Sequence, residues 1–343
     1  MSVAASTPVA RSRKVAWGAS LAAARAWLFL AALIVGFEVW SQASFGASFI
    51  LNGSNIRSIA VFATAPLLLA IGQTFVIISG GIDLSVGFTM GLAAVVASQV
   101  IDATTGSLGQ FGSLVAGVVA AGLVSLVPGV VNGLLIARLR VPPFIGTLGM
   151  YGVARGVAYL VAGGTTVPVD NEILSYLGNG SIGPIPVVVV VTAIAMLGLH
   201  YLLAQTRFGQ YTYAIGGSRQ ASVRAGINVG RVTVWLYILS GLCAALGGVL
   251  YAGRFSAGAA QAGEPLLLDS IAAVVIGGAS LFGGSGTLVG TLIGALIVAV
   301  IQYGLVFINV EPFWQFVAVG VVIIISVLVD QSQRKSSAGR VDE

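Results

Sequence analysis

Ten apolar runs, each bounded by Gly, Pro, Asn or charged residues, decide what this sequence can fold into. A helix needs about 20 apolar residues to cross the hydrocarbon layer of a membrane. The sequence therefore predicts an all-α, polytopic helical membrane protein with about ten transmembrane helices. The expected spans are residues 27–45, 56–79, 86–101, 112–137, 144–162, 184–204, 232–252, 266–282, 287–308 and 313–330.

Composition supports a membrane location over a single soluble core. Hydrophobic residues make up 57% of the 343 residues and charged residues only 8%, which is more apolar surface than one soluble core can hide. The 47 glycines against four methionines favour helices that pack backbone to backbone. The single Cys243 excludes an intrachain disulfide, and the single His200 excludes a His-cluster metal site. We therefore expect no metal on this chain.

The positions of Lys and Arg predict the orientation in the membrane. With a cytoplasmic N-terminus, thirteen of the sixteen basic residues fall in cytoplasmic segments, while Arg57 and Arg254 fall outside and Arg155 lies within a span. Cytoplasmic loops normally carry such an excess. Both termini are therefore expected in the cytoplasm. The expected organisation is an N-terminal segment 1–26, one transmembrane domain 27–330 with a cytoplasmic loop 205–231, and a cytoplasmic tail 331–343.

The basic N-terminus is expected to be retained. Arg11, Arg13 and Lys14 precede an apolar run that begins only after Arg25, and the run lacks a convincing small-residue cleavage site. This pattern favours a first membrane helix over a removed signal peptide. The net charge of +5 is explained by cytoplasmic loops, so no nucleic-acid partner is expected.

The stretch SGGIDLSVG, residues 79–87, places one carboxylate among glycines between two apolar runs. The paired glycines suit a helix end, and Asp83 or Ser85 can then accept hydrogen bonds from N–H groups at the next helix start. Alternatively, the break exposes these groups to a transported solute or a gate, because irregular backbone in a membrane requires protein or water partners. Since a capping residue can also line a path, both interpretations stand.

A second glycine-rich break, IGGASLFGGSG, follows about 200 residues later, after a span of the same predicted direction. It indicates either a duplicated module or close packing around turns. Two proline sites, Pro128 before Asn132 and Pro142–Pro143 before Phe144, predict a kinked helix and a rigid re-entry into the membrane.

The longest predicted cytoplasmic loop is basic and partly apolar. Between residues 206 and 231 it contains four arginines and no acid, and the pair Gly216–Gly217 separates two short helix-compatible pieces. Its apolar face favours docking of a soluble partner. The alternative is a connecting loop whose arginines fix topology or meet anionic lipid headgroups. The residue pattern leaves both open.

The chain lacks the groups that would drive transport by itself. Its two lysines, Lys14 and Lys335, do not belong to a GxxxxGK[ST] motif, so the chain has no P-loop for ATP. An ion-coupled carrier would use carboxylates at membrane depth, for which Asp83 is the main candidate. Enzymatic activity is not expected, since no nucleophile and base pair or metal-ligand spacing is visible.

Four motifs, in order, carry a family resemblance. They are GQTFVIISGGIDLSVG (72–87), GVVNGLLIARLRVPPFIGTLG (129–149), TRFGQYTYAIGGSRQASVRAGI (206–227) and SIAAVVIGGASLFGGSGTLVGTLIGAL (270–296). From about Asn55 to Asp330 the chain resembles the membrane permease subunits of ABC-type sugar importers, the ribose, xylose and galactoside-like branch related to branched-chain amino-acid permeases.

The resemblance implies ATP-driven import of a monosaccharide, a pentose or a hexose, across the bacterial cytoplasmic (inner) membrane. It implies a second permease chain in a homodimer or related heterodimer, two cytoplasmic ATPase domains that bind ATP and Mg, and an extracytoplasmic sugar-binding protein. The chain itself would contact membrane lipid and bind no cofactor. The alternatives are a permease for another small polar solute, such as an amino acid or a nucleoside, and an ion-coupled carrier or channel.

The resemblance also gives two sets of candidate residues, none of them catalytic. An amide suits the hydroxyls of a sugar and an aromatic ring suits its C–H face, so Asn132 and Phe144 are among the candidate pathway residues. The candidate pathway or gate residues are Gln73, Asp83, Ser85, Asn132 and Phe144. The candidate ATPase-coupling residues are Arg207, Gly209, Tyr213, Gly216, Gly217, Arg219, Arg224 and Gly226.

Overall fold

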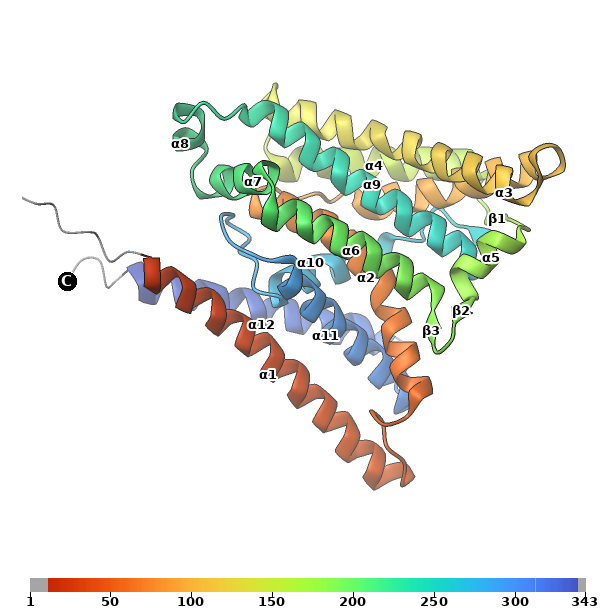
Figure 1. Cartoon of the computed structure of the whole chain (residues 1–343), viewed down its shortest axis with the longest axis horizontal. Helices are drawn as coiled ribbons and strands as arrows, with labels where there is room; N and C mark the ends of the chain where they lie inside the picture. Colours follow the sequence, from red (N-terminus) through yellow and green to blue (C-terminus); the bar gives the residue numbers. More distant parts are fainter. Residues whose placement is uncertain (1–11, 312, 339–343) are drawn as a thin grey trace, which may run out of the picture.

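The computed structural model describes residues 12–311 and 313–338, and their side chains from 25 to 311 and from 313 to 328. This part of the chain is mostly helical (Figure 1). The helices are α1 (Ser12–Phe45), α2 (Gly53–Ile78), α3 (Val86–Ala137), α4 (Pro143–Ala162), α5 (Glu172–Asn179), α6 (Val187–Gln205), α7 (Arg207–Gly217), α8 (Arg219–Arg224), α9 (Val229–Phe255), α10 (Glu264–Ile276), α11 (Leu288–Phe307) and α12 (Phe313–Ala338).

Seven of the described helices are long and apolar enough to cross a membrane. They are the 25–45 part of α1 and the whole of α2, α3, α4, α6, α9 and α11. A polytopic helical membrane protein is therefore the fold class, as the sequence predicts. The total of ten crossings and the cytoplasmic side of both ends stay predictions. Residues 1–11 and 339–343 of the expected terminal segments lie outside the described residues.

Two expected spans, 86–101 and 112–137, belong to the single element α3. Gly109 interrupts this helix with a φ of 68° and a ψ of 179°, and the chain reverses there (Figure 1). A Cβ added at Gly117 would lie 2.4 Å from the Ile101 side chain. The helices on either side of Gly109 therefore pack side by side, as two neighbouring spans would. The ten residues expected to connect them are largely helical.

The span expected at 266–282 differs most from the structure. Its helix, α10, has 13 residues and ends at Ile276, because Gly277 and Gly278 follow and Gly278 has a φ of 88°. At about 1.5 Å per residue, α10 is roughly 20 Å long, too short to cross the hydrocarbon layer alone.

Side-chain caps explain where several helices begin. A side-chain oxygen at each of these positions accepts a backbone N–H of the first turn, which satisfies a donor that has no partner within the helix. The capping residues are Asn52, Asn171, Thr206, Ser218, Asn228 and Thr287.

Close backbone packing joins α3 to α9. A Cβ at Gly129 would lie 2.8 Å from the Tyr237 carbonyl oxygen, and one at Gly241 would lie 2.6 Å from the Ser125 carbonyl oxygen. These approaches require glycine, and they fit the prediction that helices of this chain pack through small residues.

The connections gather at two ends of the helix bundle. At one end lie α7, α8 and the described ends of α1 and α12, and at the other lie α5 and the short strands (Figure 1). The strand pairs are antiparallel: β1 (Val167–Pro168) with β4 (Ala257–Gly258), and β2 (Ser181–Ile182) with β3 (Ile185–Pro186). The helices α7 and α8 thus lie at the opposite end of the bundle from α5.

Candidate functional site

The break between α2 and α3 contains a buried carboxylate with neutral partners. Asp83 Oδ1 accepts hydrogen bonds from the Ser85 backbone N–H at 3.0 Å and from Ser85 Oγ at 2.6 Å. Ser240 Oγ, on α9, donates to Asp83 Oδ2 at 2.8 Å. Asp83 is 2% exposed and Ser240 is fully buried. The carboxylate thus ties the start of α3 to α9.

Gln73 satisfies the backbone of this break. Its Nε2 donates to the Asp83 carbonyl oxygen, and its Oε1 accepts the Asp83 backbone N–H at 3.3 Å. Gln73 is fully buried on α2. The side-chain amide therefore replaces partners that a continuous helix would supply, as irregular backbone inside a membrane requires.

Asn132, from the second half of α3, completes the cluster. Its Nδ2 donates to Ser85 Oγ at 2.9 Å. Its Oδ1 is buried and accepts no hydrogen bond from the described residues. Buried polar atoms are almost always paired, so this amide retains one acceptor that the described chain leaves unused.

Four of the five candidate pathway residues therefore come together. The fifth, Phe144, lies on the first turn of α4, is 56% exposed and takes no part in these hydrogen bonds. Asp83 accepts an N–H group at the start of α3, whereas the Ser85 side chain makes no cap bond. The geometry is compatible with both sequence interpretations, a helix cap and a pathway group.

Two residues of the cluster carry no local signal in the sequence. Ser240 bonds Asp83, and the Tyr237 hydroxyl donates to the Ile82 carbonyl oxygen at 3.3 Å. Both lie on α9, three residues apart, a spacing that places them on one helix face. That spacing in an apolar run is the only hint that they act together.

The helices α2 and α10 end in the same way. The N–H groups of Gly80 and Gly81 turn back to carbonyls of the last turn of α2 at 2.9 and 3.0 Å, and those of Gly278 and Ala279 do so in α10 at 2.9 and 3.1 Å. Gly80 and Gly278 have φ values of 84° and 88°, typical of left-handed helix ends. Helix ends of this kind are common, so the matching geometry leaves both a duplicated module and close packing around turns open.

The two breaks also touch each other. The Gly284 N–H donates to the Ile78 carbonyl oxygen at 2.8 Å, and the hydroxyls of Thr74 and Thr291 lie 2.7 Å apart. The bond from Gly284 joins the end of α2 to the loop before α11. The two breaks are therefore joined by direct contacts.

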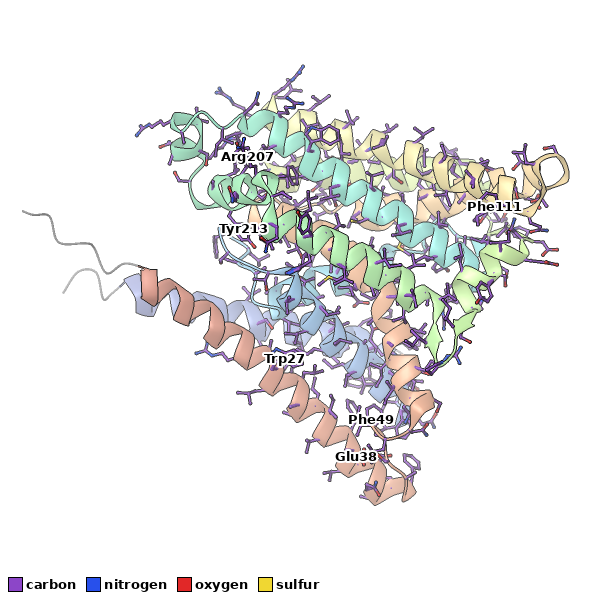
Figure 2. The ribbon with its side chains drawn as sticks, viewed as in Figure 1. Trp27, Glu38, Phe49, Phe111, Arg207 and Tyr213 are labelled. Carbon is purple, nitrogen blue, oxygen red and sulfur yellow. The ribbon has the colours of Figure 1, made fainter. Side chains whose placement is uncertain are left out.

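The helix α7 lies against this junction. A Cβ at Gly216 would lie 1.8 Å from the Ile78 carbonyl oxygen and 2.5 Å from the Gly284 nitrogen. The Tyr213 hydroxyl donates to the Gly286 carbonyl oxygen at 2.7 Å, and burial raises the pKa of Tyr213, which keeps the hydroxyl protonated. Figure 2 shows Tyr213 and Arg207 at the α7 end of the molecule. One helix thus contacts both glycine breaks.

The other loop candidates have different environments. A Cβ at Gly209 would lie 1.8 Å from the Leu203 carbonyl oxygen, so glycine permits the tight turn from α6 into α7. A Cβ at Gly217 would meet nothing within 4 Å, and the two short helices separate at Ser218 instead of at the glycine pair. Gly226 follows α8 with a φ of 80°. Arg207, Arg219 and Arg224 are exposed.

Broken apolar helices joined by buried polar groups are typical of membrane transport proteins. The family model described as "Branched-chain amino acid transport system / permease component" matches residues 55–327, and the chain belongs to this family. The resemblance found in the four motifs is thereby confirmed.

Three similar proteins extend over most of the chain. The ribose import permease protein of Bacillus subtilis (strain 168) is 41% identical over 274 residues, which cover 79% of this chain and 82% of the relative. The ribose import permease protein of Escherichia coli (strain K12) is 36% identical, with 90% and 96% covered. The fructose import permease protein of Rhizobium meliloti is 37% identical, with 79% and 76% covered.

Proposed function

We propose that this chain is the membrane permease subunit of an ATP-driven importer of a monosaccharide. The observation that carries the proposal is its similarity, over most of its length, to permeases named for ribose and fructose import. The family description names branched-chain amino acids, which keeps another small polar solute as the alternative substrate. The similar sugar permeases favour a pentose or a hexose.

Energy is proposed to come from separate ATPase subunits. The chain has no P-loop, so ATP and Mg would bind to the partner ATPase and the permease itself would catalyse no reaction. An ion-coupled carrier is disfavoured, because the similar proteins are import permeases and because Asp83 is held by three neutral donors from Ser85 and Ser240.

The α7–α8 loop is proposed to couple the ATPase to the membrane helices. Gly216 and Tyr213 support this role, because they contact the end of α2 and the glycine-rich loop between α10 and α11. Arg207, Arg219 and Arg224 are exposed and would meet the ATPase. Gly209, Gly217 and Gly226 would fix or permit the turns around the two short helices. ATPase closure would then move α7 and shift both breaks together.

The cluster around Asp83 is proposed to act as a gate or pathway element. Gln73, Ser85 and Asn132 link α2, the break and both halves of α3 through hydrogen bonds. Because the break contacts α7 through Ile78, a change in the loop would alter this network. The unused Asn132 Oδ1 would be available to a sugar hydroxyl when the gate opens.

The proposed assembly contains two permease chains, two ATPase domains and an extracytoplasmic sugar-binding protein in the bacterial inner membrane. The α7–α8 end would face the cytoplasm, with both termini, and the α5 end would receive the binding protein. The second permease chain is either a copy of this chain or a related one.

Reconstitution tests this function. Proteoliposomes would contain the permease, its ATPase and its binding protein, with ATP enclosed and no ion gradient. We expect uptake of at least one of ribose, galactose and fructose, dependent on ATP and on the binding protein. Uptake driven by an ion gradient without ATP would reject the permease assignment.

A further inference from the structure

Arg155 is an ionisable residue in the interior of a membrane helix, and the sequence patterns leave it without a role. We propose that Arg155, Tyr151 and Glu264 form a binding site for the hydroxyl groups of the transported sugar, on a face of α4 turned toward the translocation pathway. The inference rests on the proposed function, because it assumes a sugar as the solute.

Side chains from three elements build this site. The Arg155 guanidinium carbon lies 5.4 Å from the centre of the Phe88 ring on α3, within the range of a cation–π contact. The Tyr151 ring packs edge-on against the same Phe88 ring at 4.8 Å. The Tyr151 hydroxyl donates to Glu264 Oε1 on α10 at 3.3 Å and interacts electrostatically with both Glu264 and Arg155. The Tyr151 hydroxyl thus interacts with one negatively and one positively charged side chain.

The site lies within the membrane layer. The 20 residues of α4 span about 30 Å, and Arg155 is roughly 10 Å from its nearer end, Ala162. Glu264 is at the N-terminus of the half-length helix α10. Half-helix ends of this kind form substrate sites in many transporters.

The segment before Glu264 confirms that α10 begins inside the bundle. Residues 259–263 are not helical, and they run along the first turns of α3. A Cβ at Gly91 would lie 1.9 Å from the Ala260 carbonyl oxygen, and one at Gly263 would lie 2.3 Å from the Gly87 carbonyl oxygen. This packing brings Glu264 beside the first turn of α3, where Phe88 lies.

Exposure of Arg155 points to a polar pathway instead of lipid. Its side chain is exposed on the surface of the single chain. An arginine that faces the centre of a lipid layer is strongly disfavoured, so such residues face water-filled cavities or protein. The proposed second permease chain would cover this face and leave the pathway between the copies.

Periodicity places a further candidate on this face. Phe144, Leu148, Tyr151 and Arg155 follow the spacing i, i+4, i+7 and i+11, which puts them on one side of α4. Phe144 and Leu148 are 56% and 47% exposed. Phe144, which lies apart from the Asp83 cluster, therefore shares the face that carries Arg155.

The residue types suit a neutral polyhydroxylated solute. Arginine supplies only hydrogen-bond donors, a glutamate carboxylate supplies only acceptors, and a tyrosine hydroxyl supplies both. Each sugar hydroxyl also donates and accepts. An exposed arginine and a carboxylate that both interact with Tyr151 would let neighbouring sugar hydroxyls bind without a net charge on the ligand.

The first test measures uptake by Arg155→Gln and Arg155→Lys in proteoliposomes of the complete importer. The probes are radiolabelled D-ribose, D-galactose and D-fructose, and Arg57→Gln is the control for loss of an exposed arginine. We expect Arg155→Gln to lose at least tenfold in uptake per assembled complex, Arg155→Lys to lose less, and Arg57→Gln to stay within twofold. Basal ATP hydrolysis without binding protein should stay within twofold of wild type in Arg57→Gln.

The second test leaves Arg155 unchanged and therefore does not depend on folding of its variants. In a Cys243→Ala background, Leu148→Cys probes the proposed pathway face and Val153→Cys, 56% exposed, probes a different side of α4. We expect a membrane-impermeant thiol reagent to label position 148 in the complete importer, with labelling slowed at least threefold by millimolar transported sugar. Position 153 should stay unlabelled.

The outcomes separate this inference from the proposed function. If the wild-type importer takes up none of the three sugars with ATP, the proposed function fails. If it transports a sugar while Arg155→Gln transports it equally well, or while sugar leaves labelling at position 148 unchanged, the inference alone is overturned.

Discussion

Gly216 and Gly217 are adjacent on α7, yet the structure predicts opposite results for their substitution by alanine. A Cβ at position 216 would lie 1.8 Å from the Ile78 carbonyl oxygen and 2.5 Å from the Gly284 nitrogen, the two atoms that share a 2.8 Å hydrogen bond. A Cβ at position 217 would meet nothing within 4 Å. Gly217→Ala is therefore a matched control.

The expected magnitude follows from these contacts. Overpacking costs about 1–3 kcal/mol, and parting a buried hydrogen bond costs about 1–3 kcal/mol. Alanine offsets up to about 1 kcal/mol of this loss, because it has a higher helix propensity than glycine. A net loss of about 1–5 kcal/mol lowers the equilibrium constant for docking of α7 roughly 5- to 5,000-fold. Gly217→Ala should be neutral or slightly stabilising.

The assay is sugar uptake and substrate-stimulated ATP hydrolysis in proteoliposomes, compared per assembled complex. We expect Gly216→Ala to lose at least tenfold in both rates and Gly217→Ala to stay within twofold of wild type. Equal activity of the two variants would show that α7 does not act through its contact with Ile78 and Gly284.

Three further predictions concern the cluster, the topology and the coupling contact. Asp83→Asn should retain substantial ATP-driven uptake, because an amide oxygen still accepts a hydrogen bond. Asp83→Leu should lose most uptake, because it leaves buried donors without a partner at about 1–3 kcal/mol each. Inactivity of assembled Asp83→Asn would contradict this prediction. In a Cys243-free protein, labelling in intact cells should reach a cysteine at position 170 from outside but not one at position 219, and external labelling of 219 would reject the predicted orientation. Tyr213→Phe removes the 2.7 Å hydrogen bond to the Gly286 carbonyl oxygen, which contributes about 0.5–1.5 kcal/mol. This variant should transport less sugar per ATP hydrolysed. An unchanged ratio would show that the bond contributes only to stability.

Local chemistry predicted much of the helical framework. Apolar length located the helices, Pro143 marked the start of α4, and the glycines after residue 79 marked the end of α2. Such signals act over a few residues, so the sequence carries them directly. The sequence predicts two spans joined at residues 102–111, but it does not show that the helices extend to Gly109, where a single left-handed glycine reverses the chain.

Contacts between distant segments were the part that sequence reasoning missed. Ser240 bonds Asp83 across 157 positions, and Gly216 meets Ile78 across 138. These pairings depend on how helices pack, and a single sequence does not encode them in any local period. The sequence shows Arg155 only as a basic residue inside a span, because the contact between Tyr151, one turn earlier on α4, and Glu264 depends on an irregular segment more than one hundred residues later.

That irregular segment also constrains how the protein is made. Residues 259–263 lie where lipid offers no hydrogen-bonding partners. They approach α3 so closely that there is no room for a side chain at position 87 or 91, which are both glycine. The first half of α3 is synthesised more than 150 residues earlier. The C-terminal part of the chain therefore needs α3 already in place before this segment can settle in the membrane. Fragments that begin after α3 should insert incompletely unless the N-terminal part is supplied alongside them.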